Sequence, residues 1–162
     1  MIDQIVKFPA LEEIYRSIES GFKDSIIESK FEKDELSVKI KKDDLPKIIQ
    51  FLIAEKGFNA LNDIIALDNL SSMKQGQKRF SVLYQLYKFP AYLRIRLIVD
   101  VDAGESVESI YKFFKASDWA EREIYDMFGI SFNGHPDLKR IYMPNNFTEF
   151  PLRKDFPLEG KN

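Results

Sequence analysis

The residues best suited to chemistry in this chain lie close together, between residues 117 and 141. Glu121 and Asp126 flank a basic residue, Arg122, and the only histidine, His135, follows within the same segment. Neighbouring carboxylates and bases shift one another's pKa values, and histidine is the commonest general base in enzymes. The segment is therefore a candidate acid–base site made of Glu121, Asp126 and His135.

The same spacing also fits a purely structural interpretation, which the pattern alone favours. Asp118 and Glu121 have the spacing of a capping box, in which each side chain accepts a backbone N–H of the first helical turn. We therefore expect a helix from Trp119 to about Phe128, ended by Gly129. The expected buried face consists of Ala120, Ile124, Met127 and Phe128. On the opposite face Arg122 and Asp126, four residues apart, are expected to form a surface ion pair.

The composition excludes several classes of function. The sequence has no cysteine, so it forms no disulfide, no thiolate-bound zinc site and no ligated iron–sulfur cluster, and it has no cysteine nucleophile. His135 has no second histidine with which to share a metal. If the protein belongs to a redox system, we expect the electrons to be carried by other chains.

Charge and hydropathy point to a chain that neither binds nucleic acid nor spans a membrane. The net charge is only -2, with 24 basic and 26 acidic residues, and this balance does not suggest a polyanionic partner. The N-terminus lacks the pattern of a secretory signal, and the apolar runs are much shorter than the roughly 20 residues that cross a bilayer. We therefore expect a cytoplasmic location.

Periodicity predicts an α+β fold: an antiparallel or mixed sheet with helices packed on it, followed by an extended C-terminal tail. Helical spacing occurs over residues 9–21 and 43–57, and again from residue 106, where Val107, Ile110, Tyr111 and Phe114 are spaced i, i+3, i+4, i+7. Strand patterns occur over residues 25–28, 36–40, 58–70, 80–87 and 92–101, the first two forming a hairpin and the last two an antiparallel pair.

The predicted domains are an α+β domain, residues 1–128, and a tail, residues 129–162. The tail is rich in proline and alternates basic residues with aromatic ones, the basic residues being Lys139, Arg140, Arg153 and Lys154. Such interleaving occurs in proteins that stack on single-stranded nucleic acid. Because the net charge is balanced, a tail that anchors a protein partner explains the pattern better.

Residues 118–160 resemble the C subunit of the respiratory NADH:quinone oxidoreductase, complex I. The resemblance rests on Glu121-Arg122-Glu123, Asp126-Met127-Phe128, His135, Lys139 and Ile141 at the spacing of that family's signature, with Trp119 before it and Pro151-Leu152-Arg153-Lys154-Asp155-Phe156-Pro157 after it. The motif match covers about residues 118–160, and the predicted order of elements upstream is compatible with it.

The resemblance implies a non-catalytic structural subunit of the hydrophilic arm of a proton-translocating enzyme, on the cytoplasmic side of the cell membrane and held there through the complex. It implies docking on the large quinone-site subunit, which the tail crosses, beside iron–sulfur subunits. This chain would bind no cofactor, and the partner subunits would carry flavin and iron–sulfur clusters. Structural and interface roles would fall to Trp119, Glu121, Arg122, Glu123, Asp126, His135, Lys139, Arg140, Arg153, Asp155 and Phe156.

Two alternatives remain open at this point. The chain also fits the equivalent subunit of a complex I-like membrane hydrogenase, or of a dehydrogenase with another electron donor. The remaining alternative is a free-standing acid–base enzyme that uses Glu121, Asp126 and His135.

Overall fold

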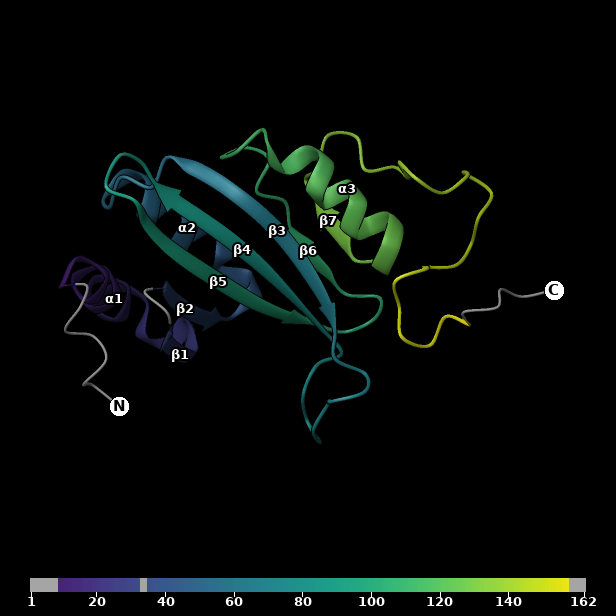
Figure 1. Ribbon diagram of the computed structural model, residues 1–162, viewed down its shortest axis with the longest axis horizontal. Coiled ribbons are helices and arrows are strands. Elements are labelled where there is room, and N and C mark those ends of the chain that lie inside the picture. Colours follow the sequence, from purple (N-terminus) through teal and green to yellow (C-terminus); the bar gives the residue numbers. More distant parts are fainter. Residues whose placement is uncertain (1–8, 33–34, 158–162) are drawn as a thin grey trace. The chain divides into compact units, whose positions relative to one another are not determined.

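The periodicity of the sequence is reproduced over most of the computed structural model, which describes residues 9–32 and 35–157 (Figure 1). The helices are α1 (Pro9–Phe22), α2 (Leu45–Ala54) and α3 (Ser117–Phe128), with short 3-10 turns η2 (Lys23–Ser25) and η3 (Lys42–Asp44). The strands are β1 (Ile26–Glu32), β2 (Glu35–Ile40), β3 (Ala60–Asp68), β4 (Phe80–Lys88), β5 (Leu93–Val101), β6 (Ser106–Glu108) and β7 (Ser131–Asn133).

The main sheet has the strand order β1-β2-β5-β4-β3 among the described residues. Strand β1 is antiparallel to β2, whereas β2 is parallel to β5, with Val38 opposite Leu97. The sheet is therefore mixed, and the predicted α+β class is confirmed. The parallel pairing requires a crossover between the two strands, and α2 lies within that connection.

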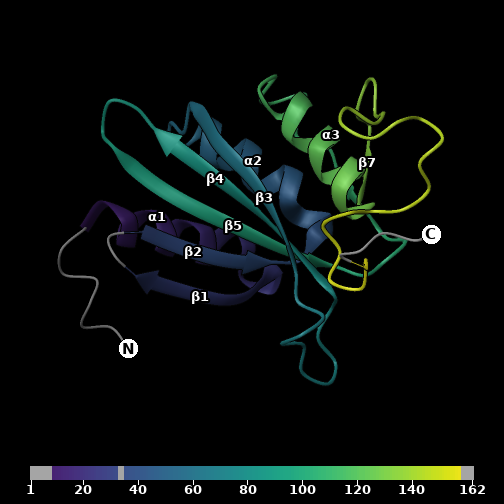
Figure 2. The same ribbon diagram turned by 45° about the vertical axis from the view of Figure 1, so that its right-hand side comes forward.

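Contacts within the chain divide it into two compact units. The first comprises residues 1–63 and 83–99, and the second comprises residues 64–82 and 100–162. In the first unit, α1 contacts β2 (Figure 2). The apolar stripes of α1 and α2 are fully or almost fully buried, as are the inward-facing residues of β2 and β5. All the predicted site residues belong to the second unit.

The helix expected from residue 106 is wrong. The structure forms β6 there, which pairs in parallel with β7 and places Val107 opposite Phe132. The N–H of Ser109 donates to the carbonyl of Asn133, and the N–H of Ile110 donates to the side chain of Glu121. These two N–H groups therefore have partners other than the carbonyls of a helix. The spacing of apolar residues here imitates a helix, but long-range pairing decides the conformation.

The second unit also contains α3 and a long irregular segment. After β7, residues 134–157 contain neither helix nor strand, and short hydrogen-bonded turns occur among them. The end of the predicted tail, residues 158–162, lies outside the described residues, and the boundary proposed at residue 128 stays a prediction. None of the described helices combines the length and the apolar character needed to cross a membrane.

Candidate functional site

Helix α3 is the element that positions most of the predicted site residues. It begins at Ser117, whose N–H donates to the carbonyl of Phe114 at 3.0 Å, and it ends at Gly129, which has the left-handed conformation (φ 71°). The predicted glycine stop is confirmed. The acidic residues of the helix, however, face surroundings other than those expected from spacing.

The prediction of a capping box is wrong. The residue before the helix is Ala116, and no side chain caps the first turn. Glu121 instead is completely buried, where it accepts hydrogen bonds from the Ser109 hydroxyl at 2.6 Å and from the N–H of Ile110 at 2.9 Å. Burial raises the pKa of Glu121, although these hydrogen bonds oppose the rise. Glu121 therefore fastens the segment after β6 to α3.

His135 lies beside this carboxylate, with its side chain fully buried. Its Nδ1 accepts the N–H of Asp137 at 3.1 Å, so the proton of the neutral ring is assigned to Nε2. Nε2 lies 3.3 Å from Oδ1 of Asp118 and 4.0 Å from Oε2 of Glu121. The structure thus brings Glu121 and His135 together, as an acid–base pair would require. Both are closed to solvent, so their position suits a structural contact between the His135 turn and α3.

Asp126 is the most heavily hydrogen-bonded of the predicted residues. One oxygen accepts the successive backbone N–H groups of Ile141, Tyr142 and Met143 at 3.0, 2.7 and 3.0 Å, and the other accepts from Arg140 at 2.6 Å. Burial alone would raise the pKa of Asp126, but these hydrogen bonds outweigh it and hold the pKa below its ordinary value. Asp126 therefore binds the early part of the tail to α3.

The ion pair expected between Arg122 and Asp126 is consequently wrong, because Asp126 is buried with Arg140. Arg122 instead stacks on Trp119 at 5.1 Å and donates to the carbonyl of Lys139. Trp119 remains 65% exposed. Arg122 therefore makes its contacts on the outer surface of α3, not on its buried face.

Of three other predicted residues, two are exposed and one is half-buried. Glu123 is exposed, as is Lys139, which forms an ion pair with Asp137 at 2.7 Å. Phe156 is half-buried, and its ring lies 6.3 Å from that of Phe147. The two rings bring separate parts of the tail together.

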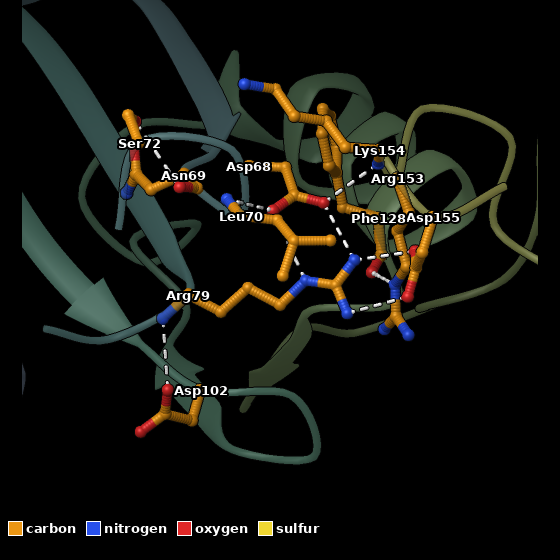
Figure 3. A network of polar contacts seen from close by, with 10 residues as sticks. All are labelled: Asp68, Asn69, Leu70, Ser72, Arg79, Asp102, Phe128, Arg153, Lys154 and Asp155. Carbon is orange, nitrogen blue, oxygen red and sulfur yellow. Dashed lines mark hydrogen bonds and ion pairs between the residues drawn. The ribbon is translucent and has the colours of Figure 1, made fainter. Parts of the chain in front are cut away.

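Sequence reasoning missed a second polar cluster, centred on Asp68 and Arg79 (Figure 3). Asp68 ends β3 with its side chain only 1% exposed, and it accepts two hydrogen bonds from Arg79 and one each from the N–H groups of Leu70 and Lys154. Arg79 also forms two hydrogen bonds, at 2.9 and 2.6 Å, with Asp155 of the tail. Burial would raise the pKa of Asp68, but the hydrogen bonds of Arg79 and the two N–H groups lower it to about 2.

One signal in the sequence could have revealed Asp68. In β3 the inward positions are Ile64, Ala66 and Asp68, so the acidic residue falls on the buried side of the alternation. A carboxylate at such a position is rarely left without a partner. The identity of that partner, Arg79, could not be read from spacing.

Arg153 completes the attachment of the tail. Its Nε donates to the carbonyl of Phe128 at 2.6 Å, and its guanidinium stacks on Phe150 at 4.3 Å and on Phe80 at 5.4 Å. A Cβ on Gly129 would lie 2.6 Å from Nη2 of Arg153 and from the ring of Phe150. The glycine therefore both ends α3 and makes room for this stack.

The arrangement as a whole fastens an irregular segment to a folded unit. Across the described part of the chain, no group of three or more His, Cys, Asp or Glu residues is placed to hold a metal ion. The buried charges at Asp68 and Asp126 are occupied by hydrogen bonds within the chain, whereas Trp119, Tyr142 and Leu152 are 65%, 61% and 53% exposed. Such exposed apolar side chains around a polar framework are typical of a protein-binding surface.

Comparison with known proteins gives concordant similarities. A family model described as the respiratory-chain NADH dehydrogenase 30-kDa subunit matches residues 38–162. The chain is 38% identical over 140 residues to a Geobacter metallireducens protein named as the C subunit of NADH-quinone oxidoreductase, covering 86% of this chain and 85% of the relative. A Cereibacter sphaeroides protein of the same name is 35% identical over 153 residues, covering 93% and 74%.

Solved structures resemble the chain as well. A trypsin-resistant fragment of Nqo5 superposes with a TM-score of 0.69 at 30% identity, covering 80% of this chain and 99% of the fragment. A component of the membrane-bound sulfane sulfur reductase, an archaeal respiratory membrane complex, gives a TM-score of 0.74 at 19% identity, covering 91% and 85%. At that identity the second similarity concerns the fold alone.

Proposed function

We infer the role of this chain from its family, since it belongs to the family of the 30-kDa subunit of respiratory-chain NADH dehydrogenase. Its role is that of a non-catalytic structural subunit in the hydrophilic arm of a proton-translocating NADH:quinone oxidoreductase. There it docks on the large quinone-site subunit, beside the iron–sulfur subunits. The partner subunits hold the flavin and the clusters, and the complex keeps the chain peripheral on the cytoplasmic side of the cell membrane.

The observation that carries this proposal is the use made of the charged residues around α3. Contacts within the chain occupy three of these charges: Glu121 fastens the segment after β6 to α3, and the pair of Asp126 and Arg140 attaches the tail to the helix. That arrangement leaves an ordered surface bearing Trp119 and Tyr142. Large, exposed aromatic residues on a rigid support are the usual anchors of a protein interface. The interface proposed here therefore comprises the outer face of α3 and the tail.

The proposal is tested by isolating the tagged full-length chain from native membranes and identifying its partners by mass spectrometry. We expect the large quinone-site subunit and iron–sulfur subunits, with NADH-oxidising activity in the complex and none in the chain alone. Recovery of the chain without any other respiratory subunit would overturn the proposal, as would a stoichiometric flavin or iron centre in the isolated chain.

A matched pair of variants tests the interface. Trp119→Ala removes an exposed anchor of α3, while Ile27→Ala removes a side chain of similar exposure, 59%, from β1 in the first unit. We expect Trp119→Ala to weaken co-purification by about tenfold or more, as hot-spot truncations do, and Ile27→Ala to leave it unchanged. Equal effects of the two substitutions would show that the outer face of α3 is not part of the interface.

The alternative of a related complex with another electron donor is decided by the same preparation. The fold is shared with a component of the archaeal sulfane sulfur reductase complex, so fold alone does not separate the two. Co-purified subunits that oxidise NADH would identify the first complex, and their absence from an otherwise complete assembly would identify the second.

A further inference from the structure

The side chain of Arg153 is held rigidly in place, yet the end of its guanidinium is unused. Its Nε–H is bound to the carbonyl of Phe128, and the rings of Phe150 and Phe80 pack against its plane. Within the part of the chain that the structure describes, no hydrogen bond or ion pair involves its two terminal nitrogens, and no dashed line reaches them in Figure 3. The four N–H donors of these two nitrogens therefore have no acceptor among the described residues.

The neighbouring arginine shows what a completed arrangement looks like. Arg79 meets two carboxylates, with hydrogen bonds to Asp68 and Asp155 at distances from 2.6 to 3.2 Å. Asp155 lies two residues from Arg153 in the sequence, but its carboxylate is bound by Arg79. The carboxylates of Asp68 and Asp155, which both act electrostatically on Arg153, are thus bound by a different cation.

The surroundings of Arg153 favour an additional anion. Burial and the positive charge of Arg79 lower the pKa of Arg153 by more than the nearby carboxylates raise it. A half-buried guanidinium beside a second cation is stabilised by an anion that restores the balance. Because stacking and the Nε bond fix its plane, the two terminal nitrogens present a preorganised fork, the geometry that a carboxylate accepts in a bidentate pair.

We propose that the terminal nitrogens of Arg153 bind a carboxylate of a partner subunit. This carboxylate belongs to an Asp or Glu side chain that meets the free end of the guanidinium, beside Phe150 and Phe80. This rests on the proposed function, because the acid comes from a protein docked on the tail. The pair would fix the register of that partner on the tail segment Pro151–Pro157, since a bidentate contact tolerates little displacement.

Chemical modification of the wild-type protein tests this without any substitution. A dicarbonyl reagent, phenylglyoxal, reacts with the two terminal nitrogens of accessible arginines, and peptide mass spectrometry locates the product. We expect Arg153 to react in the isolated full-length chain and to be protected at least about tenfold in the purified complex. Arg79 is the control, because carboxylates of this chain occupy it in both states. Equal reactivity of Arg153 in the isolated chain and in the complex would overturn the proposal.

A substitution then identifies the acid. Arg153→Lys places an amine at the same position, and a zero-length carbodiimide joins an amine to a carboxylate only when the two are in contact. Applied to the assembled complex, the reagent is expected to link residue 153 to an Asp or Glu of another subunit. A link confined to this chain would refute the partner assignment, and so would an assembled complex without a link at residue 153.

The two proposals fail in different ways. If the chain does not co-purify with respiratory subunits, the proposed function fails. If it co-purifies while Arg153 keeps the reactivity of the isolated chain, the proposed function stands and the carboxylate partner is refuted. Should Arg153→Lys prevent assembly, the modification experiment on the wild-type complex still decides the matter.

Discussion

Asp126→Asn tests the central claim that a buried carboxylate binds the tail to α3. The substitution keeps the size of the side chain and removes one oxygen and the charge. An amide oxygen can still accept the N–H groups of Ile141, Tyr142 and Met143, but the amide nitrogen then faces Arg140, so that two donors meet. In the opposite orientation the oxygen meets Arg140, and three N–H groups lose their acceptor.

The expected loss of stability is large in either orientation. The side chains of Asp126 and Arg140 are 0% and 11% exposed, so the pair is almost fully removed from water. Removing one partner of a buried pair costs about 3–5 kcal/mol, because the other charge is left uncompensated. Arg140 retains the carbonyls of Asp126 and Glu149, which places the expected value at the lower end, about 3 kcal/mol. That is a considerable part of the about 5–15 kcal/mol of a typical domain.

Urea unfolding followed by circular dichroism measures the difference, with Glu123→Gln on the exposed side of α3 as the matched control. The control is expected to change the free energy of unfolding by less than about 0.5 kcal/mol. A loss below about 1 kcal/mol for Asp126→Asn would refute the assignment of Asp126 as the anchor of the tail.

The pH dependence provides an independent check of the same reasoning. The pKa of Asp126 is lower in the folded state than its ordinary value, so the ionised carboxylate stabilises the fold above the unfolded-state pKa, 3.8. This stabilisation is lost as the pH falls through the folded-state pKa. The difference between wild type and Asp126→Asn should therefore shrink below about pH 4. A difference that stays constant from pH 7 into this range would show that the substitution acts through packing alone.

Three further predictions concern the other contacts of the second unit. Arg79→Gln leaves Asp68 buried without its cation and is expected to cost about 3 kcal/mol, whereas Asp155→Asn, at a half-exposed carboxylate, should cost less than about 1 kcal/mol in the same urea experiment. Gly129→Ala should destabilise the chain by at least about 1 kcal/mol more than Gly134→Ala, because both glycines have positive φ but only the first would place a Cβ against neighbouring atoms. Glu121→Gln should change stability little at pH 7. Relative to wild type, the variant should become less stable as the pH falls toward the unfolded-state pKa, because the pKa of Glu121 is raised in the folded state and its protonation therefore stabilises the wild-type fold.

The regular elements could be predicted because each has a strong local pattern. Inward residues alternate along β5, where Ile95, Leu97, Val99 and Val101 are buried, and such alternation has no helical equivalent. Pro46 in the first turn of α2 and Gly129 after α3 mark the helix ends by conformational rules that hold in any fold.

The errors arose where a local pattern competed with a distant partner. Asp118 and Glu121 match a capping box, but Ser109 and Ile110 take the Glu121 carboxylate from another element. Arg122 and Asp126 match a surface pair, but Arg140 takes Asp126 from the tail. A sequence shows which side chains need partners, while the fold decides which partners come within reach.

The contacts of Asp126 bear on where the folded domain ends. The domain expected from the sequence, residues 1–128, would stop before Arg140 and residues 141–143, which donate the four hydrogen bonds described above to the Asp126 carboxylate. A fragment of residues 1–128 would keep that carboxylate buried without a partner, or expose the core beside it. Ending at Met143 retains all four of these hydrogen bonds, and Asp68 keeps Arg79.

We therefore expect residues 1–143 to unfold cooperatively in urea and residues 1–128 to lack a cooperative transition, because an unpaired buried charge costs about 3–5 kcal/mol. The longer fragment should nevertheless dock poorly, since it lacks Leu152 and Arg153 of the proposed interface. Circular dichroism and co-purification measure the two properties separately. Cooperative folding of residues 1–128 would show that the tail contributes only to docking. Wild-type docking of residues 1–143 would show that the interface lies on α3 and the early tail alone.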